Sequence, residues 1–284
     1  MTLAVTRSNR INWHRVMAVA KIELKQLAQA RDFWLPMLVL GSVFFVVTPA
    51  VLLTTITSIG GNETVGRLAD ALDALPRSAR GQLLGQSPQA RTGYALAVYL
   101  LAPMAVIVPL TISTAVGAAT IVGERERGTG EFLAHSPTDV RELYLGKLLA
   151  SIVPGYATVL IGFGLYSLIV NLTVGSAIGH WFFPTAQWWL MILWVLPPFL
   201  VLCLSVVVRL SARVTSTTAA QQASGLVSLP VIGLAYSQAT GALFGAAVLG
   251  ATAGLVAWIL AVVSLKRAVR SIKRSRLLGI SSDL

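Results

Sequence analysis

Long apolar runs alternate with shorter polar segments along most of the chain. The hydrocarbon core of a membrane is about 30 Å thick, so a helix needs roughly 20 apolar residues to cross it. Six runs reach this length, and none of them contains Asp, Glu, Lys or Arg. They cover Trp34–Ile56, Tyr94–Val122, Leu148–Val170, Trp188–Val208, Ser216–Tyr236 and Leu243–Leu265. The fifth is the weakest, because seven Ser, Thr and Gln residues dilute it. The pattern predicts an all-α, polytopic membrane protein with six transmembrane helices.

The segment before the first run has the spacing of an amphipathic helix. Trp13, Met17 and Leu24 belong to its apolar positions, whereas Lys21 and Lys25 lie elsewhere around the helix. A tryptophan and lysines beside a membrane span favour a helix that lies in the membrane interface and contacts lipid. An ordinary amphipathic helix packed on another protein is the alternative.

Prolines and glycines fall inside several of the apolar runs. Neighbouring helices in a membrane can satisfy the carbonyl groups that a proline leaves unpaired, so these prolines predict kinks. They are Pro49, Pro103, Pro109, Pro154, Pro197 and Pro198. In or beside the last run, Gly241, Gly245, Gly250 and Gly254 form two Gly-x-x-x-Gly pairs, a spacing that permits close helix packing.

Composition agrees with a membrane protein, and the distribution of charge gives it an orientation. Of the 284 residues, 55% are hydrophobic and 12% are charged, with a net charge of +11. Four segments carry 18 of the 22 Lys and Arg residues: residues 1–33, residues 123–147, the loop with Arg209 and Arg213, and the tail after Leu265. The positive-inside rule places these segments in the cytoplasm. We therefore expect a multi-pass protein of the cell inner or plasma membrane with both termini cytoplasmic.

This orientation divides the chain into three parts. Residues 1–33 form a cytoplasmic or interfacial helix, residues 34–265 form the transmembrane domain, and residues 266–284 form a basic cytoplasmic tail. Within the transmembrane domain, residues 57–93 are an extracytoplasmic loop and residues 123–147 a cytoplasmic one.

The outer loop after the third run is rich in aromatic residues. It contains Trp181, Phe182, Phe183, Trp188 and Trp189. Aromatic side chains gather at the level of lipid headgroups, so we interpret this cluster as a membrane anchor. A gate for a transported substrate is the alternative.

Residues that would carry out chemistry are sparse. His14, His135 and His180 are scattered, and the single cysteine, Cys203, has no partner for a disulfide or metal site. Gly123 and Gly128 imitate the spacing of a phosphate-binding loop, but the lysine that must reach the phosphates is missing. We expect no catalytic site, cofactor or metal in this chain, and no binding of nucleic acid, because no soluble basic domain exists to carry it.

The charged segment Gly123–Lys147 interrupts two apolar runs. Nine of its 25 residues are charged. Gly128 and Gly130 let the chain turn, and Ser136 followed by Pro137 has the pattern of a helix start, with Ser136 as the N-cap. The segment therefore predicts a small helical projection suited to docking in a cleft of a cytoplasmic partner. A solvated loop that only sets the topology is the alternative.

The same segment resembles a known signature. Residues 124–151, ERERGTGEFLAHSPTDVRELYLGKLLAS, are similar to the loop of type-2 ABC exporter permeases, the ABC-2 type membrane proteins. Nine residues occupy the positions of that signature: Glu124, Glu126, Gly128, Thr129, Glu131, Leu133, Pro137, Gly146 and Lys147. Phe132 stands where leucine is usual, and His135 where a small residue is usual.

The resemblance implies a role for the chain and for its loop. It implies the permease subunit of an ABC exporter, in which the loop is a coupling helix that docks on a separate nucleotide-binding ATPase subunit. ATP and Mg²⁺ would be bound by that partner, and a second permease copy or a paralogue would complete the transport pathway. Glu124, Glu126 and Glu131 are the candidates for polar contact or bracing. Phe132 and Leu133 are the candidates for apolar insertion.

Two other functions stay open. The chain could be a non-transporting membrane subunit that transmits ATPase strokes to an extracytoplasmic partner through residues 57–93. A secondary transporter is the other alternative, although the sequence has neither the intramembrane carboxylate nor the internal repeat that would favour it.

Overall fold

Helices account for every element of the part of the chain that the structure describes. The computed structural model describes residues 11–58, 81, 83–126, 138–211, 233, 236–237 and 247–271. Five helical stretches are long and apolar enough to cross a membrane: Arg31–Ser58, Pro88–Thr120, Val140–Ile178, Ala186–Val207 and Val248–Val269. They overlap the first four predicted runs and the last one. The predicted run Ser216–Tyr236 lies almost entirely outside the described residues, so the number six stays a prediction, whereas the all-α polytopic fold is confirmed.

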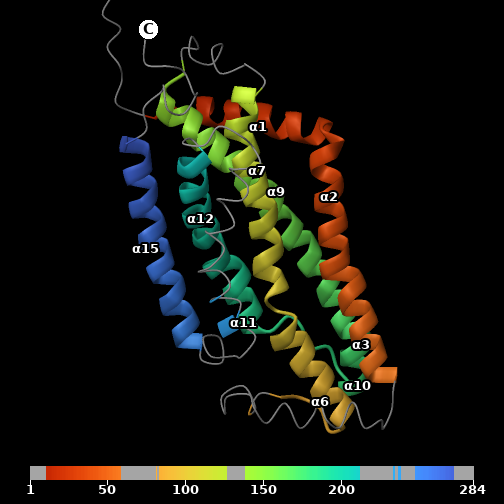
Figure 1. Ribbon diagram of the computed structural model, residues 1–284. Coiled ribbons are helices and arrows are strands. Elements are labelled where there is room, and N and C mark those ends of the chain that lie inside the picture. The colour runs from red at the N-terminus through yellow and green to blue at the C-terminus, as the bar shows by residue number, and fades with distance from the viewer. Residues whose placement is uncertain are drawn as a thin grey trace, which may run out of the picture.

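The first span follows a helix that lies across one end of the bundle (Figure 1). Helix α1 (Trp13–Gln29) begins at Asn12, whose side chain accepts a hydrogen bond from the His14 amide at 3.0 Å. Ala30 has an extended backbone and forms the corner to α2 (Arg31–Ser42). The span continues through the π-helical turn η1 (Val43–Val47) and α3 (Thr48–Ser58).

The second and third spans form a long hairpin whose connection is the charged segment. The second span consists of α6 (Pro88–Ala95), the π-helical turn η3 (Leu96–Leu100) and α7 (Met104–Glu126). The third consists of α9 (Val140–Val170), the π-helical turn η4 (Asn171–Gly175) and α10 (Ser176–Ile178). Helix α7 leads into the charged segment and helix α9 follows it. The last turn of α7 and the first turn of α9 therefore lie at the same end of the bundle as α1 (Figure 1).

Two further spans complete the described bundle. The fourth contains α11 (Ala186–Trp189), the π-helical turn η5 (Leu190–Val195) and α12 (Leu196–Ser211). The last is α15 (Ala247–Ser271), which packs on α12 and η5. There the indole of Trp194 lies directly over Gly254, and its Nε1 donates to the Ala251 carbonyl at 3.1 Å. A close neighbour is thus present at Gly254, the second glycine of that pair, and it is the side chain of a tryptophan.

Prolines change the helix type in three of the spans. The turns η1, η3 and η5 come shortly before Pro49, Pro103 and Pro197, and the second span is interrupted between Leu100 and Met104. A proline cannot donate its backbone hydrogen bond, and its ring crowds the preceding turn, which favours the wider π-helical turn next to it. Pro109 and Pro154 instead lie inside continuous α-helices. Among these prolines, a change of helix type thus accompanies Pro49, Pro103 and the pair Pro197 and Pro198, and the predicted kinks stay predictions.

Helix α9 is the centre of the bundle, and glycines let other helices approach it. Val19 of α1 lies against Gly146, the Pro109 carbonyl of α7 lies against Gly155, and Phe45 of η1 lies against Gly162. Each of these neighbours occupies the space where a larger residue would place its Cβ atom. Small residues permit this close packing in membranes, where helices do not gain from leaving water.

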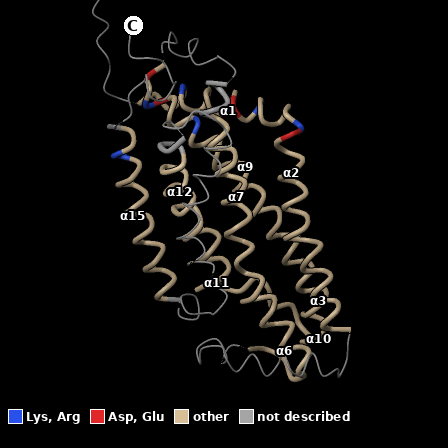
Figure 2. Tube along the Cα trace, in the orientation of Figure 1, with Lys and Arg blue, Asp and Glu red and all other residues tan. Residues whose placement is uncertain are grey.

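Charged residues and buried aromatic residues lie toward opposite ends of the bundle. Lys, Arg, Asp and Glu gather at the end where α1 lies (Figure 2), and among the described residues Arg91 on α6 is the exception. We call this the charged end: α1, the last turns of α7 and the first turns of α9. At the opposite end lie α6, η4, α10 and α11, together with many buried aromatic side chains. We call it the aromatic end.

Candidate functional site at the base of the charged loop

The structure describes both stems of the charged segment. The backbone of Glu124 and Glu126 belongs to the last turn of α7. The remaining predicted coupling residues lie outside the described residues: Gly128, Thr129, Glu131, Phe132, Leu133 and Pro137. Their roles stay predictions. What the structure describes is the base that flanks residues 127–137 on both sides.

Helix α9 begins with a capping box. The Asp139 side chain accepts from the Arg141 amide at 3.2 Å, and the Glu142 side chain accepts from the Asp139 amide at 3.3 Å. This reciprocal pair satisfies amides that the first helical turn leaves without partners. Asp139 is therefore the N-cap of α9, and the prediction that Ser136 is the N-cap of this helix is wrong. The Asp-x-x-Glu spacing was present in the sequence but the neighbouring Ser-Pro pair concealed it.

Glu142 also holds the beginning of α1. Its Oε1 accepts from the backbone amide of Asn12 at 2.9 Å, and its Oε2 lies 3.8 Å from an Arg15 guanidinium nitrogen. Glu142 is buried, whereas the Arg15 side chain is 51% exposed. One carboxylate thus caps α9 and fixes the first residues of α1 beside it.

A buried lysine joins three helices one turn further along α9. Lys147 Nζ lies 2.7 Å from Glu23 Oε1 of α1 and donates to the Thr120 carbonyl of α7 at 2.8 Å. The side chains of Lys147 and Glu23 are 1% and 12% exposed. We call this arrangement the Lys147 junction: the Lys147 ammonium, the Glu23 carboxylate and the Thr120 carbonyl. Because a buried charge is costly unless it is paired and hydrogen-bonded, the junction determines how α1, α7 and α9 fit together.

The neighbouring glycine makes room for α1 at this junction. A Cβ atom at Gly146 would lie 2.6 Å from Val19 and 3.0 Å from the Val16 carbonyl oxygen. Val16 and Ala20 are buried on the same face of α1, which therefore packs on α9 and not on lipid. Trp13 and Met17 remain exposed, and Leu24 is half-buried. The contact of these three residues with a membrane stays a prediction.

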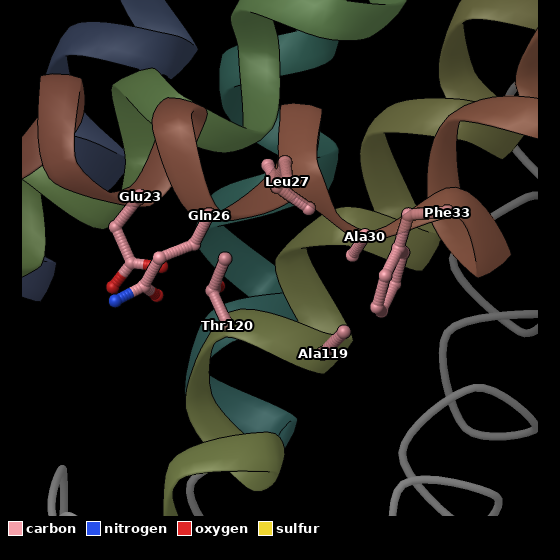
Figure 3. A pocket seen from close by; sticks show the side chains of 7 residues that line it. All are labelled: Glu23, Gln26, Leu27, Ala30, Phe33, Ala119 and Thr120. Atoms are coloured by element: carbon pink, nitrogen blue, oxygen red, sulfur yellow. The ribbon is translucent and has the colours of Figure 1, made fainter.

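A small pocket separates the corner between α1 and α2 from α7. Its volume is about 40 Å³. It is lined by Glu23, Gln26, Leu27, Ala30, Phe33, Ala119 and Thr120 (Figure 3). Pockets that take organic ligands measure about 300 Å³ or more, so this one has room only for water-sized molecules. It lies beside the Lys147 junction, between residues of α1 and residues of α7.

Sequence reasoning missed the residues that build this base. The sequence assigns Lys147 to the positive-inside charges and to the family signature but not to a buried ion pair, and it gives Glu23 and Glu142 no role. One signal was available for Glu23, because it falls on the same helical face as Val16 and Ala20. Within the described residues, no group of three or more His, Cys, Asp and Glu is placed to hold a metal ion.

The aromatic end departs from its sequence interpretation. Phe183 and Trp188 are 4% and 1% exposed, and Trp188 stacks on Phe163 and Tyr166. These two residues belong to the protein core, so their interpretation as membrane anchors is wrong. Trp181 and Trp189 are exposed, which leaves the anchoring role open for them.

Hydrogen bonds complete the aromatic end. Tyr166 Oη donates to the Ala97 carbonyl at 2.6 Å, and Trp188 Nε1 donates to the Val98 carbonyl at 3.0 Å. Both carbonyls belong to η3. Asn171 accepts from the amides of Phe182 and Phe183 at 3.1 Å each and donates to the Phe183 carbonyl at 2.6 Å. Neutral side chains therefore fasten the loop and the interrupted second span to the third and fourth spans.

Comparison with known proteins adds one match. A family model described as "ABC-2 family transporter protein" matches residues 17–247. The matched region runs from α1 to the first residue of α15 and includes the whole charged segment. No curated protein matches the chain.

Proposed function

The chain belongs to the ABC-2 family of transporter proteins, and from this membership we propose that it couples ATP hydrolysis on a separate nucleotide-binding subunit to the export of a substrate. Membership and the apolar spans make it a multi-pass membrane permease component of an ABC transporter. The observation that carries the coupling proposal is the Lys147 junction. It braces the two stems of the charged segment, α7 and α9, at the place where a partner would push.

In this proposal the charged segment docks into a groove of the ATPase subunit. Glu131 makes polar contact there, while Phe132 and Leu133 insert apolar side chains. Eight residues form the docking unit: Glu124, Glu126, Gly128, Thr129, Glu131, Phe132, Leu133 and Pro137. ATP and Mg²⁺ are bound by the partner. Closure of the ATPase subunits then moves α7 and α9, and the spans rock between inward and outward openings.

The proposed orientation follows from charge. Because Lys and Arg gather at the charged end, the positive-inside rule favours a cytoplasmic position for that end and for both termini (Figure 2). A second copy of the chain or a paralogue encloses the pathway. Apolar side chains exposed along α2, α9 and α15 provide surfaces for lipid and for that second copy.

Co-purification tests the proposal. The protein, tagged at its C-terminus, is extracted gently from its native membrane, and the proteins that accompany it are identified by mass spectrometry. We expect an ATPase subunit with a phosphate-binding loop. We expect the double variant Glu131→Lys/Phe132→Ala to lose it, because the change reverses one charge and removes the apolar insertion.

A matched variant separates docking from folding. Trp181→Ala removes a side chain larger than that of Phe132, but at the aromatic end, where Trp181 is 68% exposed. This variant should retain the ATPase. If no ATPase accompanies the wild type, the proposed function is wrong. If the double variant retains the ATPase as the wild type does, the docking role of residues 124–137 is wrong.

A further inference from the structure

The Lys147 junction occupies a particular position on the hairpin of α7 and α9. It joins the two helices at Thr120 and Lys147, one to two turns before the described stems end at Glu126 and Val140. These last turns connect residues 127–137 covalently to the rest of the bundle. We propose that Lys147 is a positioning residue for coupling, which holds α7, α9 and α1 together so that residues 127–137 meet the ATPase in one orientation. This inference rests on the proposed function.

The contact between α7 and α9 explains why such a residue is needed. Along the antiparallel pair, Ser113 lies against Gly155, and Gly117 lies against Ser151. These are van der Waals contacts between small groups, which permit close approach of the two helices but are not directional. Nearer the charged segment, Lys147 donates a hydrogen bond to the Thr120 carbonyl. Because it is directional and charge-assisted, it fixes the rotation of α7 relative to α9.

The same ammonium adds α1 to this unit. Helix α1 packs on α9 at Gly146 but is separated from α7 by the pocket of about 40 Å³. Glu23 lies at the edge of that pocket, where it reaches Lys147 at 2.7 Å. The junction therefore links α1 to α7 across a gap that packing does not fill. Opening it would leave an ammonium and a carboxylate buried without each other, so we expect it to stay closed during transport.

A structural role and a positioning role predict different behaviour of variants. Removing one member of a buried ion pair is destabilising, whereas replacing both by apolar residues of similar size is often neutral or stabilising. Glu23→Met and Lys147→Met should therefore each lower the unfolding temperature, and the double variant should recover it. If the pair serves stability alone, the double variant also recovers every function.

The experiment measures ATPase binding at equal stability. Wild type, the double variant Glu23→Met/Lys147→Met, and the control Lys25→Met are placed in lipid nanodiscs, and the affinity of the purified ATPase subunit is titrated. Lys25 is an exposed lysine on α1, the helix of Glu23, so its variant replaces a lysine by methionine without changing the junction. We expect the control to bind like the wild type and the double variant to bind about two- to thirtyfold more weakly, the range of couplings through packed networks.

Two results would contradict the expectation, and each would overturn a different proposal. A double variant that unfolds like the wild type and binds the ATPase as tightly overturns the positioning role of Lys147 and leaves the proposed function standing. A wild type that binds no ATPase overturns the proposed function itself.

Discussion

The two ends of the bundle are held together by different kinds of polar contact. At the charged end, Lys147 joins α1, α7 and α9 through a carboxylate and a backbone carbonyl. At the aromatic end, Tyr166 and Trp188 join the third and fourth spans to η3 by donating to its carbonyls. Both ends bury polar groups between three segments that are distant in the sequence, but in the described part of the chain the charged end alone uses a buried ion pair to do it.

The difference predicts how each end responds to perturbation. Stacked rings and neutral hydrogen bonds contribute in separable parts, so the aromatic end should lose stability stepwise as groups are removed. An ion pair in a low-dielectric setting behaves as a unit, because either member alone is worse than neither. The aromatic end is therefore suited to holding the bundle together, and the charged end to holding a defined arrangement of helices.

The largest effect is expected from Trp188→Ala. The indole contacts the rings of Phe163, Tyr166 and Phe183 at centroid distances of 5.8, 5.2 and 4.9 Å. Removing a buried aromatic side chain of this kind costs about 3–5 kcal/mol. We expect that loss in the free energy of unfolding, measured by denaturation in mixed micelles and followed by circular dichroism. The control Trp181→Ala, at an exposed position, should stay within about 0.5 kcal/mol of wild type.

Trp188→Phe tests whether, at the aromatic end, the ring contacts and the hydrogen bond of Trp188 contribute separately to the free energy of unfolding. Phenylalanine keeps a ring in the stack but cannot donate to the Val98 carbonyl. We expect a loss of about 1–3 kcal/mol, clearly smaller than that of the alanine variant. Equal losses for the two variants would contradict the stepwise behaviour and make this end a single unit like the other.

A smaller effect is expected from Asn171→Leu. The side chain of Asn171 bonds both amides and one carbonyl of the Phe182–Phe183 loop, and leucine of similar size leaves these groups unpaired. Hydrogen bonds within membrane proteins contribute modestly, so we expect about 1–2 kcal/mol in the same unfolding measurement. The matched control is Thr173→Val on the same turn, because the Thr173 hydroxyl bonds only carbonyls of its own span. A control that destabilises as much as the leucine variant would show that the loop contacts of Asn171 contribute nothing.

Sequence reasoning succeeded where the signal is local. Apolar runs without charge identified the five described spans, because the membrane requires such runs whatever the tertiary structure. The helix of the third span was predicted to begin before its apolar run, at Ser136, and α9 does begin before Leu148, with Asp139 as its N-cap. The π-helical turn η3 could not be located from the sequence, because its carbonyls at Ala97 and Val98 accept hydrogen bonds from Tyr166 and Trp188 of other spans.

The candidate site could likewise be predicted from the sequence only in part. The charged segment stood out by its composition and by its resemblance to a family signature, and the family match confirms that resemblance. Its base escaped notice, because Lys147 and Glu23 are 124 residues apart and each alone looks like an ordinary solvated charge. Pairing them requires the knowledge that α1 folds back on α9. The aromatic residues were misinterpreted for a similar reason, because the burial of Phe183 and Trp188 depends on η3 lying beside them.

The smallest effect is expected within the charged end itself, from Arg15→Gln. Arg15 is half-exposed and lies 3.8 Å from Glu142, so its ion pair is screened by solvent and contributes less than about 1 kcal/mol. Glu142 keeps its bonds from the amides of Asn12 and Asp139 in the variant. We expect a small loss in the free energy of unfolding at low salt that disappears at high salt, whereas the loss caused by Lys147→Met should be large and nearly independent of salt. A salt-dependent loss for Lys147→Met would place that ammonium in contact with water and remove the basis for treating the junction as a buried unit.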